Sequence, residues 1–165
     1  MTVNTSGNVT IDGKIFSSDD AISFGNVRFG QSTSITSAGG AISIGNITGF
    51  GSNRDVTITS TGGTANTVTV GSIGGGNINA VAITSGTLTT LNGDITTNNT
   101  SGNSVTLVGT TTNGANITID TNNTSNDGAI NIAAFSSSNN NLALDSGTAD
   151  INLSGAAFNL SLIHI

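Results

Sequence analysis

The chain of 165 residues contains no cysteine, proline, tryptophan or tyrosine. Without cysteine it cannot be a disulfide scaffold, hold a cysteine-based zinc site or use a cysteine nucleophile. With only six Phe as aromatic residues, it also lacks the side chains that usually line ligand pockets. The absence of proline suits a β protein, because every strand residue can donate its N–H to a ladder.

Charged residues are scarce, and cations are scarcer than acids. Nine Asp and no Glu are balanced only by Lys14, Arg28 and Arg54, which gives a net charge of −6. Nucleic-acid-binding proteins and proteins of anionic membrane surfaces carry the opposite, basic charge pattern. We therefore expect no nucleic-acid partner.

Residues 56–93 carry no charge at all, so this stretch has to be examined as a membrane span. It is rich in Thr, Asn and Gly, whereas a spanning helix needs about 20 consecutive apolar residues. We expect no membrane insertion. Residues 1–5 lack the basic region and apolar core of a signal peptide, so none is visible in this sequence.

The last six residues, Leu-Ser-Leu-Ile-His-Ile at 160–165, are the most apolar run and break the preceding pattern. They match a translation of the transposase adapter used in sequencing libraries. We interpret residues 160–165 as a tail of adapter-derived, non-native sequence; the alternative is an ordinary last strand over Leu160–Leu162. In the first interpretation the natural chain continues, and His164, the only histidine, is not native.

Thr, Asn, Gly and Ser make up 94 of the 165 residues. The apolar residues that lie between these polar and small residues follow a repeat. Three-residue segments with apolar, small and apolar side chains occur at Val9–Ile11, Ile22–Phe24, Ile42–Ile44, Val56–Ile58, Val68–Val70, Val81–Ile83, Val105–Leu107, Ile117–Ile119, Ile130–Ile132, Leu142–Leu144 and Ile151–Leu153. Many of these segments begin 12 or 13 residues apart, and residues 21–27 match residues 41–47 at a spacing of 20. The repeat therefore has a period of 20–26 residues for each pair of strands.

Each segment has the two-residue alternation of a β-strand, with its first and third side chains on one face. Between the segments lie clusters such as Gly39-Gly40, Gly62-Gly63 and Gly74-Gly75-Gly76. We expect these glycines to supply the positive φ angles of tight corners. No helical periodicity of useful length is present.

Strands this short bury too little for the core of a sandwich or barrel, whose strands have about five or six residues. A parallel β-helix shares one narrow core among stacked coils. We therefore predict that residues 1–159 form a β-solenoid of about seven coils with 20–26 residues each, of either hand. The predicted inward side chains are Ile44, Ile58, Val70, Ile83, Leu107, Ile119, Ile132 and Leu144, and the predicted outward ones are Thr57, Thr69, Thr106 and Thr118.

Three phrases carry a family resemblance: residues 40–45 (Gly-Ala-Ile-Ser-Ile-Gly), residues 91–97 (Leu-Asn-Gly-Asp-Ile-Thr-Thr) and residues 127–132 (Asp-Gly-Ala-Ile-Asn-Ile). They resemble the repetitive parts of bacterial surface proteins of the filamentous-haemagglutinin and autotransporter-passenger group. The likeness covers nearly all of residues 1–159. It implies a parallel β-helix and a secreted or cell-surface setting for a longer parent protein.

Some β-helix proteins cleave polysaccharides, so the acids were considered as paired catalytic carboxyls. Asp19-Asp20 is the only adjacent pair, and in a turn both would be solvated. Asp120, Asp127, Asp145 and Asp150 are 7, 18 and 5 residues apart in turn, steps that do not match one coil. We interpret these aspartates as surface residues that keep the protein soluble.

Other kinds of site are no better supported. Gly74–Asn79 approaches a calcium-binding nonapeptide, but Asn replaces the required Asp and there is no tandem copy. A Ser–His–Asp triad would need His164. Thr57-Ile58-Thr59 and Thr67-Val68-Thr69 begin an ice-binding type of ladder that later segments do not continue. We expect no catalytic, cofactor-binding or metal-binding residues.

These patterns favour a non-enzymatic spacer segment of a large secreted or cell-surface adhesin-like protein. Its expected partners are neighbouring coils of the parent protein, and host or matrix surfaces through other domains. The alternatives are part of a carbohydrate-active β-helix whose active site lies mostly elsewhere, and an ice-binding solenoid. In isolation we expect end-to-end association, because edge strands need protection and repeat arrays need polar caps.

Overall fold

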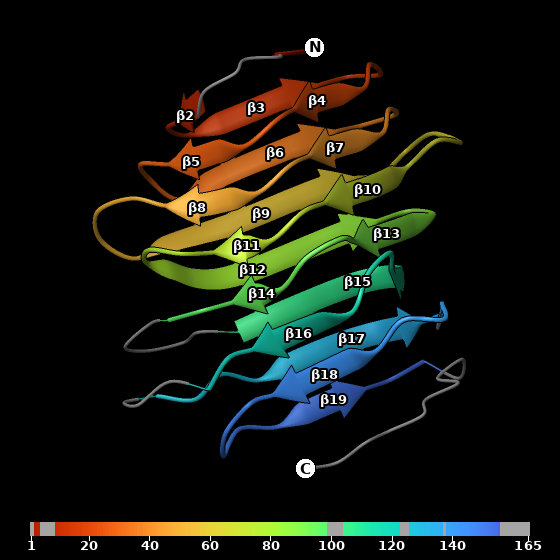
Figure 1. The fold of residues 1–165 in the computed structure, drawn as a ribbon. Helices are drawn as coiled ribbons and strands as arrows, with labels where there is room; N and C mark the ends of the chain where they lie inside the picture. The colour runs from red at the N-terminus through yellow and green to blue at the C-terminus, as the bar shows by residue number, and fades with distance from the viewer. Residues whose placement is uncertain (1, 4–8, 99–103, 123–125, 137, 156–165) are drawn as a thin grey trace.

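The computed structural model describes residues 2–3, 9–98, 104–122, 126–136 and 138–155. These residues form only β-strands and connecting loops, without any helix, and every strand pairing among them is parallel. Figure 1 shows the strands stacked as a solenoid of about six turns, from the N-terminal end at the top to the C-terminal end at the bottom. The predicted all-β parallel solenoid is confirmed, and the predicted number of about seven coils is close. Residues 160–165 lie outside the described part.

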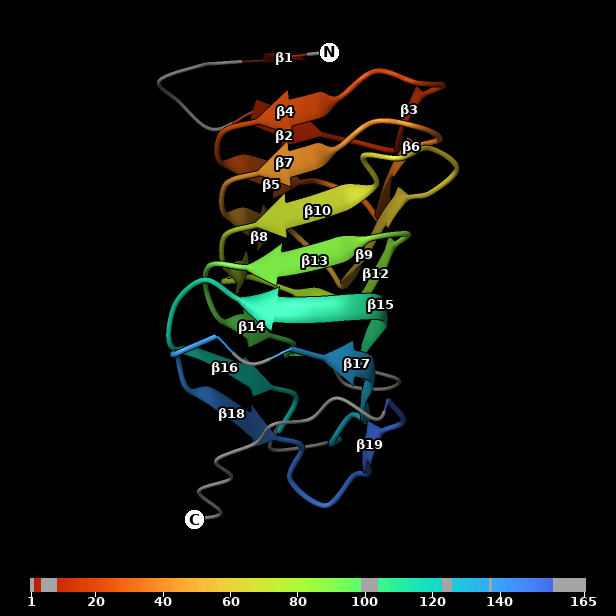
Figure 2. The ribbon, with the colours of Figure 1, turned by 90° about the vertical axis from the view of Figure 1, so that its right-hand side faces the viewer.

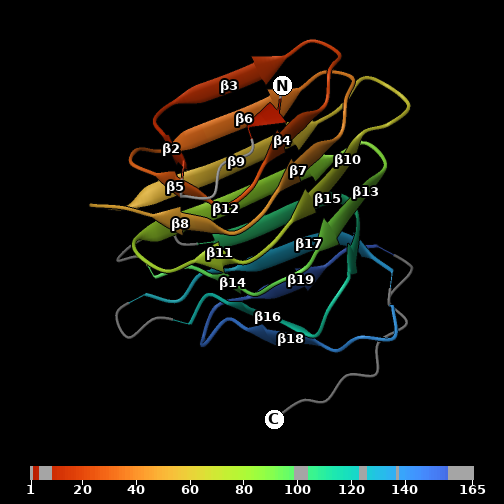
Figure 3. The same ribbon diagram turned by 45° about the horizontal axis from the view of Figure 1, so that its top comes forward.

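The strands lie on three faces, which we number in chain order (Figure 2, Figure 3). Face 1 contains β1 (Thr2–Val3), β4 (Ile22–Phe24), β7 (Ile42–Ile44), β10 (Thr67–Val70) and β13 (Leu88–Leu91). Face 2 contains β2 (Val9–Ile11), β5 (Val27–Phe29), β8 (Ile47–Gly49), β11 (Ile73–Gly74), β14 (Ile95–Thr96), β16 (Ile117–Asp120) and β18 (Leu142–Asp145). Face 3 contains β3 (Lys14–Ser17), β6 (Thr33–Ser37), β9 (Arg54–Ser60), β12 (Ile78–Ser85), β15 (Ser104–Asn113), β17 (Ile130–Phe135) and β19 (Ile151–Leu153).

The residue step from one turn to the next agrees with the sequence pattern, but the number of strands in a turn does not. The Asn46 N–H donates to Asn26 Oδ1, 20 residues earlier, and the Ser72 N–H donates to Asn46 Oδ1, 26 residues earlier. The assignment of this period to a pair of strands is wrong, since most turns contain three. Most of the additional strands were missed because they are short or have Thr or Ser at inward positions, whereas β5 was missed because its middle residue, Arg28, is not small.

Strand β15 joins two of the faces. Its residues Ser104–Val108 pair with β12 on face 3, and its residues Thr111–Asn113 pair with β13 on face 1. Faces 1 and 3 therefore belong to one 12-stranded sheet, whereas face 2 is a separate seven-stranded sheet. The strand turns the corner at Gly109, whose φ is +92° and whose added Cβ would lie 2.2 Å from the Ser85 carbonyl oxygen.

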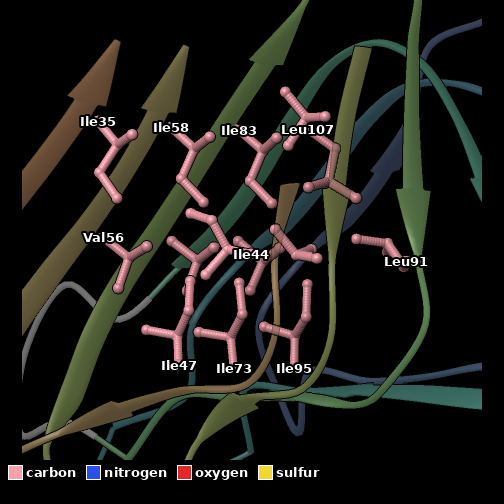
Figure 4. Close-up of a cluster of buried hydrophobic side chains, with 14 of the residues drawn as sticks. Ile35, Ile44, Ile47, Val56, Ile58, Ile73, Ile83, Leu91, Ile95 and Leu107 are labelled. Atoms are coloured by element: carbon pink, nitrogen blue, oxygen red, sulfur yellow. The ribbon is translucent and has the colours of Figure 1, made fainter. Parts of the chain in front are cut away.

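The core consists of columns of aliphatic side chains that run from turn to turn (Figure 4). Ile35, Ile58 and Ile83 follow one another on face 3 and are fully buried. Ile47, Ile73 and Ile95 form a matching column on face 2. All the side chains predicted to face inward are buried except Leu144, which is partly buried, and the four Thr predicted to face outward are half-buried.

Serine side chains occupy the inward position at the corner between faces 3 and 1. Ser37, Ser60 and Ser85 are register partners on successive turns, and all three are buried. Ser60 Oγ donates to the Gly40 carbonyl oxygen at 2.9 Å, and Ser85 Oγ donates to the Asn66 carbonyl oxygen at 2.6 Å. A small hydroxyl side chain thus satisfies loop carbonyls that the ladder leaves free.

The prediction that the glycine clusters supply positive φ angles is correct only in part. Gly62, Gly75 and Gly76 have positive φ, but Gly39 and Gly40 do not. At Gly40 the requirement is space, because an added Cβ would lie 2.4 Å from the backbone of Asp20 in the preceding turn. Stacked loops therefore select glycine by close backbone approach as well as by dihedral angle.

Candidate functional site

The outer surfaces of faces 1 and 3 consist of columns with one residue from each turn, and most of these side chains are short and polar. On face 1 the central column is Ser23, Ser43, Thr69, Thr90 and Thr112. On face 3 two columns run side by side: Lys14, Ser34, Thr57, Ala82, Thr106, Asn131 and Asn152; and Phe16, Thr36, Thr59, Thr84 and Val108. Such columns present hydroxyl, methyl and amide groups and few charges.

The two Thr-x-Thr segments singled out in the sequence do not form one ladder. Thr57 and Thr59 lie in β9 on face 3, whereas Thr67 and Thr69 lie in β10 on face 1. The continuous array lies on face 3 instead, where Thr36, Thr59 and Thr84 are register partners. It ends at Val108, so the hydroxyl ladder is three residues long in this column.

Two open hollows lie on face 3. One has a volume of about 280 Å³ and is lined by the outward groups of β15, β17 and β19, among them Thr106, Val108 and Asn131. The other, of about 210 Å³, is lined by Lys14 and Asp55 together with hydroxyl side chains. The volume of the first hollow lies close to the lower end of the roughly 300–1,000 Å³ of ordinary ligand pockets, and the volume of the second lies below it.

The adjacent acids Asp19 and Asp20 lie in the turn between β3 and β4, and both are exposed. The Asp20 N–H donates to Ser17 Oγ at 3.0 Å. Asp19 Oδ1 lies above Gly39 of the next turn, only 2.3 Å from where a Cβ would stand. This placement agrees with the interpretation of the pair as solvated turn residues.

The expectation that the C-terminal acids do not stack is wrong for one pair. Asp120 of β16 and Asp145 of β18 are register partners, one turn of 25 residues apart. The sequence analysis measured spacings only between successive acids. Because Asp127 lies between Asp120 and Asp145 in the sequence, the spacing of one turn between these two residues was missed. Asp120 Oδ1 accepts the Asn122 N–H at 2.9 Å, and Asp145 Oδ1 accepts the Gly147 N–H at 3.1 Å. Two like charges are therefore held side by side on face 2, each hydrogen-bonded to its own loop.

The other two acids of this group, Asp127 and Asp150, take part in hydrogen bonds that involve the backbone. Asp127 Oδ2 accepts hydrogen bonds from the N–H and the hydroxyl of Thr148, both at 2.6 Å, and so joins two loops 21 residues apart. Asp150 is exposed, and its carbonyl oxygen accepts the Ile130 N–H at 3.0 Å. Neither carboxylate belongs to the Asp120–Asp145 pair by register.

The segment Gly74–Asn79, the nearest approach to a calcium motif, connects β11 to β12. Its amides bind the preceding turn: Asn77 Nδ2 donates to the Gly51 carbonyl oxygen, and Asn79 Nδ2 donates to Asp55 Oδ1 at 2.6 Å. In the described part of the chain, no three His, Cys, Asp or Glu side chains gather where they could hold a metal ion. His164 lies outside the described residues.

The sequence analysis did not identify two exposed aromatic residues, Phe16 and Phe50. Phe16 in β3 is 70% exposed, and Phe50, in the loop after β8, lies under the Arg28 guanidinium with 4.4 Å between Cζ and the ring centroid. Arg28 and Phe50 are 22 residues apart, about one turn, and this spacing is the signal that could have paired them. A cation over a ring is a favourable contact of about 0.5–1 kcal/mol at exposed sites.

The columns, hollows and acid pairs thus form no enclosed cleft with converging catalytic groups in the described ranges. The described ranges contain only strands and loops, so they include no membrane-spanning helix. No protein-family model, curated protein or solved structure matches this chain.

Proposed function

We propose that the chain is a structural spacer segment of a large secreted or cell-surface adhesin-like protein and that it performs no catalysis. The observation that carries this proposal is the continuous stack of turns on one core. The seven strands of face 2, at about 4.8 Å each, extend over about 30 Å. Because each turn bonds mainly to its neighbours, length can be added turn by turn without changing the fold.

The outer surface supports the same proposal. Its columns consist largely of Ser, Thr and Asn, and the large apolar side chains with high exposure in the described part are Phe16, Phe50, Val108 and Ile151. A surface with few charges and isolated apolar groups offers little for strong binding. We infer that ligand binding in the parent protein belongs to other domains.

Surface labelling of the source cells tests the proposal. Antibodies raised against this chain should label intact cells, and protease treatment of the intact cells should remove the label. Labelling that appears only after lysis would contradict a surface location. The coding sequence on both sides should contain an export signal and further turns of 20–26 residues, whereas an adjoining catalytic module would favour the alternative.

The alternative is part of a carbohydrate-active β-helix, and the Asp120–Asp145 pair is the observation in its favour. Glycoside hydrolysis uses two carboxyl groups about 5–9.5 Å apart. In this alternative the active site lies mostly outside this chain, so the protein extended by its adjoining turns should release reducing ends from a polysaccharide, and Asp145→Asn should abolish the release. A panel of plant, bacterial and animal polysaccharides that stays intact in the presence of the extended protein would contradict this alternative.

A further inference from the structure

Asparagine followed by glycine occurs twice in the chain, at Asn92-Gly93 and at Asn113-Gly114. The first pair lies in the connection between β13 on face 1 and β14 on face 2 (Figure 2), and the second lies where β15 ends. Leu91 and Asn113 are register partners, so the two pairs are neighbours on successive turns. The same dipeptide is therefore present in two environments of one solenoid.

An asparagine that precedes glycine can lose its amide nitrogen without an enzyme. The backbone nitrogen of the glycine attacks Cγ of the asparagine side chain, an N–C bond forms, and the amide nitrogen takes up the proton and leaves as ammonia. Water then opens the succinimide ring at either carbonyl group, which gives aspartate or isoaspartate. Glycine favours ring closure because it has no Cβ and the least restricted backbone. The reaction needs a free side-chain amide, a free glycine N–H and access of water.

The pair Asn92-Gly93 meets these requirements. Asn92 is exposed, and neither its side-chain amide nor the Gly93 N–H forms a hydrogen bond with any residue that the structure describes. The backbone N–H of Asn92 donates to the Val70 carbonyl oxygen at 2.8 Å. That bond involves neither Cγ of Asn92 nor the nitrogen of Gly93, so both reacting atoms are free to approach each other in the presence of water.

At Asn113-Gly114 the fold holds the same atoms in place. Asn113 is 0% exposed, and its Nδ2 donates to the carbonyl oxygens of Ala115 at 3.0 Å and Asn141 at 2.9 Å. The Gly114 N–H donates to the Leu91 carbonyl oxygen at 2.8 Å. Ring closure at this pair would break all three hydrogen bonds at a position shielded from water. The structure therefore protects the second pair.

The stacking of the turns itself requires glycine at position 93. A Cβ added to Gly93 would lie 2.7 Å from the backbone nitrogen of Ser72 in the preceding turn. Any other residue would have to displace that turn, so a bulkier residue after Asn92, which would slow the reaction, does not fit. The reactivity of Asn92 is thus a consequence of the close approach between two turns of the solenoid.

The reaction changes both the charge and the backbone of this turn. Either product replaces a neutral amide by a carboxylate. Isoaspartate also directs the backbone through the former side chain and so adds a methylene group between β13 and β14. Leu91 is the register partner of Val70, and Ile95 is the register partner of Ile73, so both ends of the connection are fixed on the preceding turn. A longer connection between these fixed ends weakens the turn.

We propose that Asn92-Gly93 is a site of spontaneous deamidation in the folded protein, and that the fold protects Asn113-Gly114 from the same reaction. Water is the co-reactant, and ammonia leaves. The solenoid thereby ages at one defined turn, where isoaspartate accumulates with time. This inference goes beyond the proposed spacer function and does not depend on it, because the following experiments report the chemical state of two asparagines and not the location of the protein.

The first test follows both pairs in one sample. The chain is incubated at neutral pH, either native or in concentrated guanidinium chloride, and its proteolytic peptides are analysed by mass spectrometry, with isoaspartate detected by an isoaspartyl methyltransferase. In the native chain Asn92 should deamidate at least about tenfold faster than Asn113, whose site must first open locally. In the denaturant the two rates should agree within about twofold, since no structure protects either pair. Equal rates in the native chain, or a native Asn92 that stays intact while it reacts in the denaturant, would overturn the proposal.

Two further measurements separate the parts of the proposal. In amide hydrogen exchange, the Gly93 N–H should exchange rapidly, whereas the Gly114 N–H should exchange slowly because it is hydrogen-bonded. A slowly exchanging Gly93 N–H would contradict the free site. Asn92→Asp supplies the charge without the added methylene group and is the matched control for ageing. An aged chain enriched in isoaspartate should unfold at a lower temperature than Asn92→Asp, and equal unfolding temperatures would overturn the effect of the longer backbone.

Discussion

Thr89 and Thr111 lie directly opposite each other on adjacent turns, and neither buried hydroxyl has a hydrogen-bond partner among the described residues. Their side chains point into the core on face 1, in the column that Ile42 and Val68 occupy in the preceding turns. A buried polar group without a partner costs about 1–3 kcal/mol. The column therefore changes from aliphatic to hydroxyl side chains without a compensating bond.

Replacing Thr89 by Val should raise the free energy of unfolding by about 1 kcal/mol, because it removes the unpaired hydroxyl and keeps the shape. Urea denaturation followed by circular dichroism measures the change. The matched control is Thr90→Val, which faces outward in the same strand and should change stability by less than about 0.5 kcal/mol. A loss of stability in Thr89→Val would show that the hydroxyl binds a buried water.

Neighbouring residues in β16 should differ strongly in their contribution to stability. Ile119 is buried in the core, whereas Thr118 faces outward and uses its backbone N–H, not its side chain, to bind Asp94 Oδ1 at 2.7 Å. Ile119→Ala should lower the free energy of unfolding by about 2–5 kcal/mol through loss of apolar burial and formation of a cavity. Thr118→Ala should change it by no more than about 0.5 kcal/mol. Equal losses in chemical denaturation would contradict the assigned facing of this strand.

The corner of β15 should not tolerate a side chain at Gly109. Its φ of +92° is unfavourable for alanine, and the new Cβ would lie 2.2 Å from the Ser85 carbonyl oxygen. We expect Gly109→Ala to cost about 1–3 kcal/mol. Gly25→Ala is the control, since its φ is ordinary and an added Cβ meets nothing within 4 Å. The two midpoints of thermal unfolding should differ, and coincidence of the midpoints would refute the tight corner.

The serine at the corner of β9 should stabilise the loop of the preceding turn. Ser60→Ala removes the hydrogen bond to the buried Gly40 carbonyl oxygen, and we expect a loss of about 1–2 kcal/mol. Ser43→Ala, in the outward column of face 1, should have almost no effect. Hydrogen exchange would also report faster exchange near Gly40 in Ser60→Ala only, and unchanged rates there would count against the role of this hydroxyl.

The core could be predicted from the sequence because alternation in a strand is a local property. Every apolar segment named from the sequence lies in a strand, and the inward residues such as Ile58 and Ile83 are buried as expected. One or two strands were missed in several turns, among them β13, which has Thr89 at an inward position, and β11, which has only two residues. Inward Thr side chains look like surface residues in a sequence, and only the register reveals their burial.

Relations between turns were harder to predict than those within a strand. The turn length varies from 20 to 26 residues, so a fixed spacing cannot say which residues are opposite each other. Asp120 and Asp145 were not paired although their spacing of 25 residues fits this range, because only successive acids were compared. Thr57 and Thr67, which are 10 residues apart, were placed in one ladder although they lie on different faces. Loop length decides these positions, and loop length is not encoded in the apolar pattern.

The single strand β15 has a mechanical consequence. If tension is applied along the rod, the turns of a solenoid should peel off one after another, because each is held mainly by its neighbours. At β15 this order is interrupted, since Ser104–Val108 pairs on face 3 and Thr111–Asn113 pairs on face 1 within one continuous strand. To detach β15, its pairing on both faces must break together. We therefore expect the turns before β15 to detach one by one, and β15 itself to detach only at a higher force.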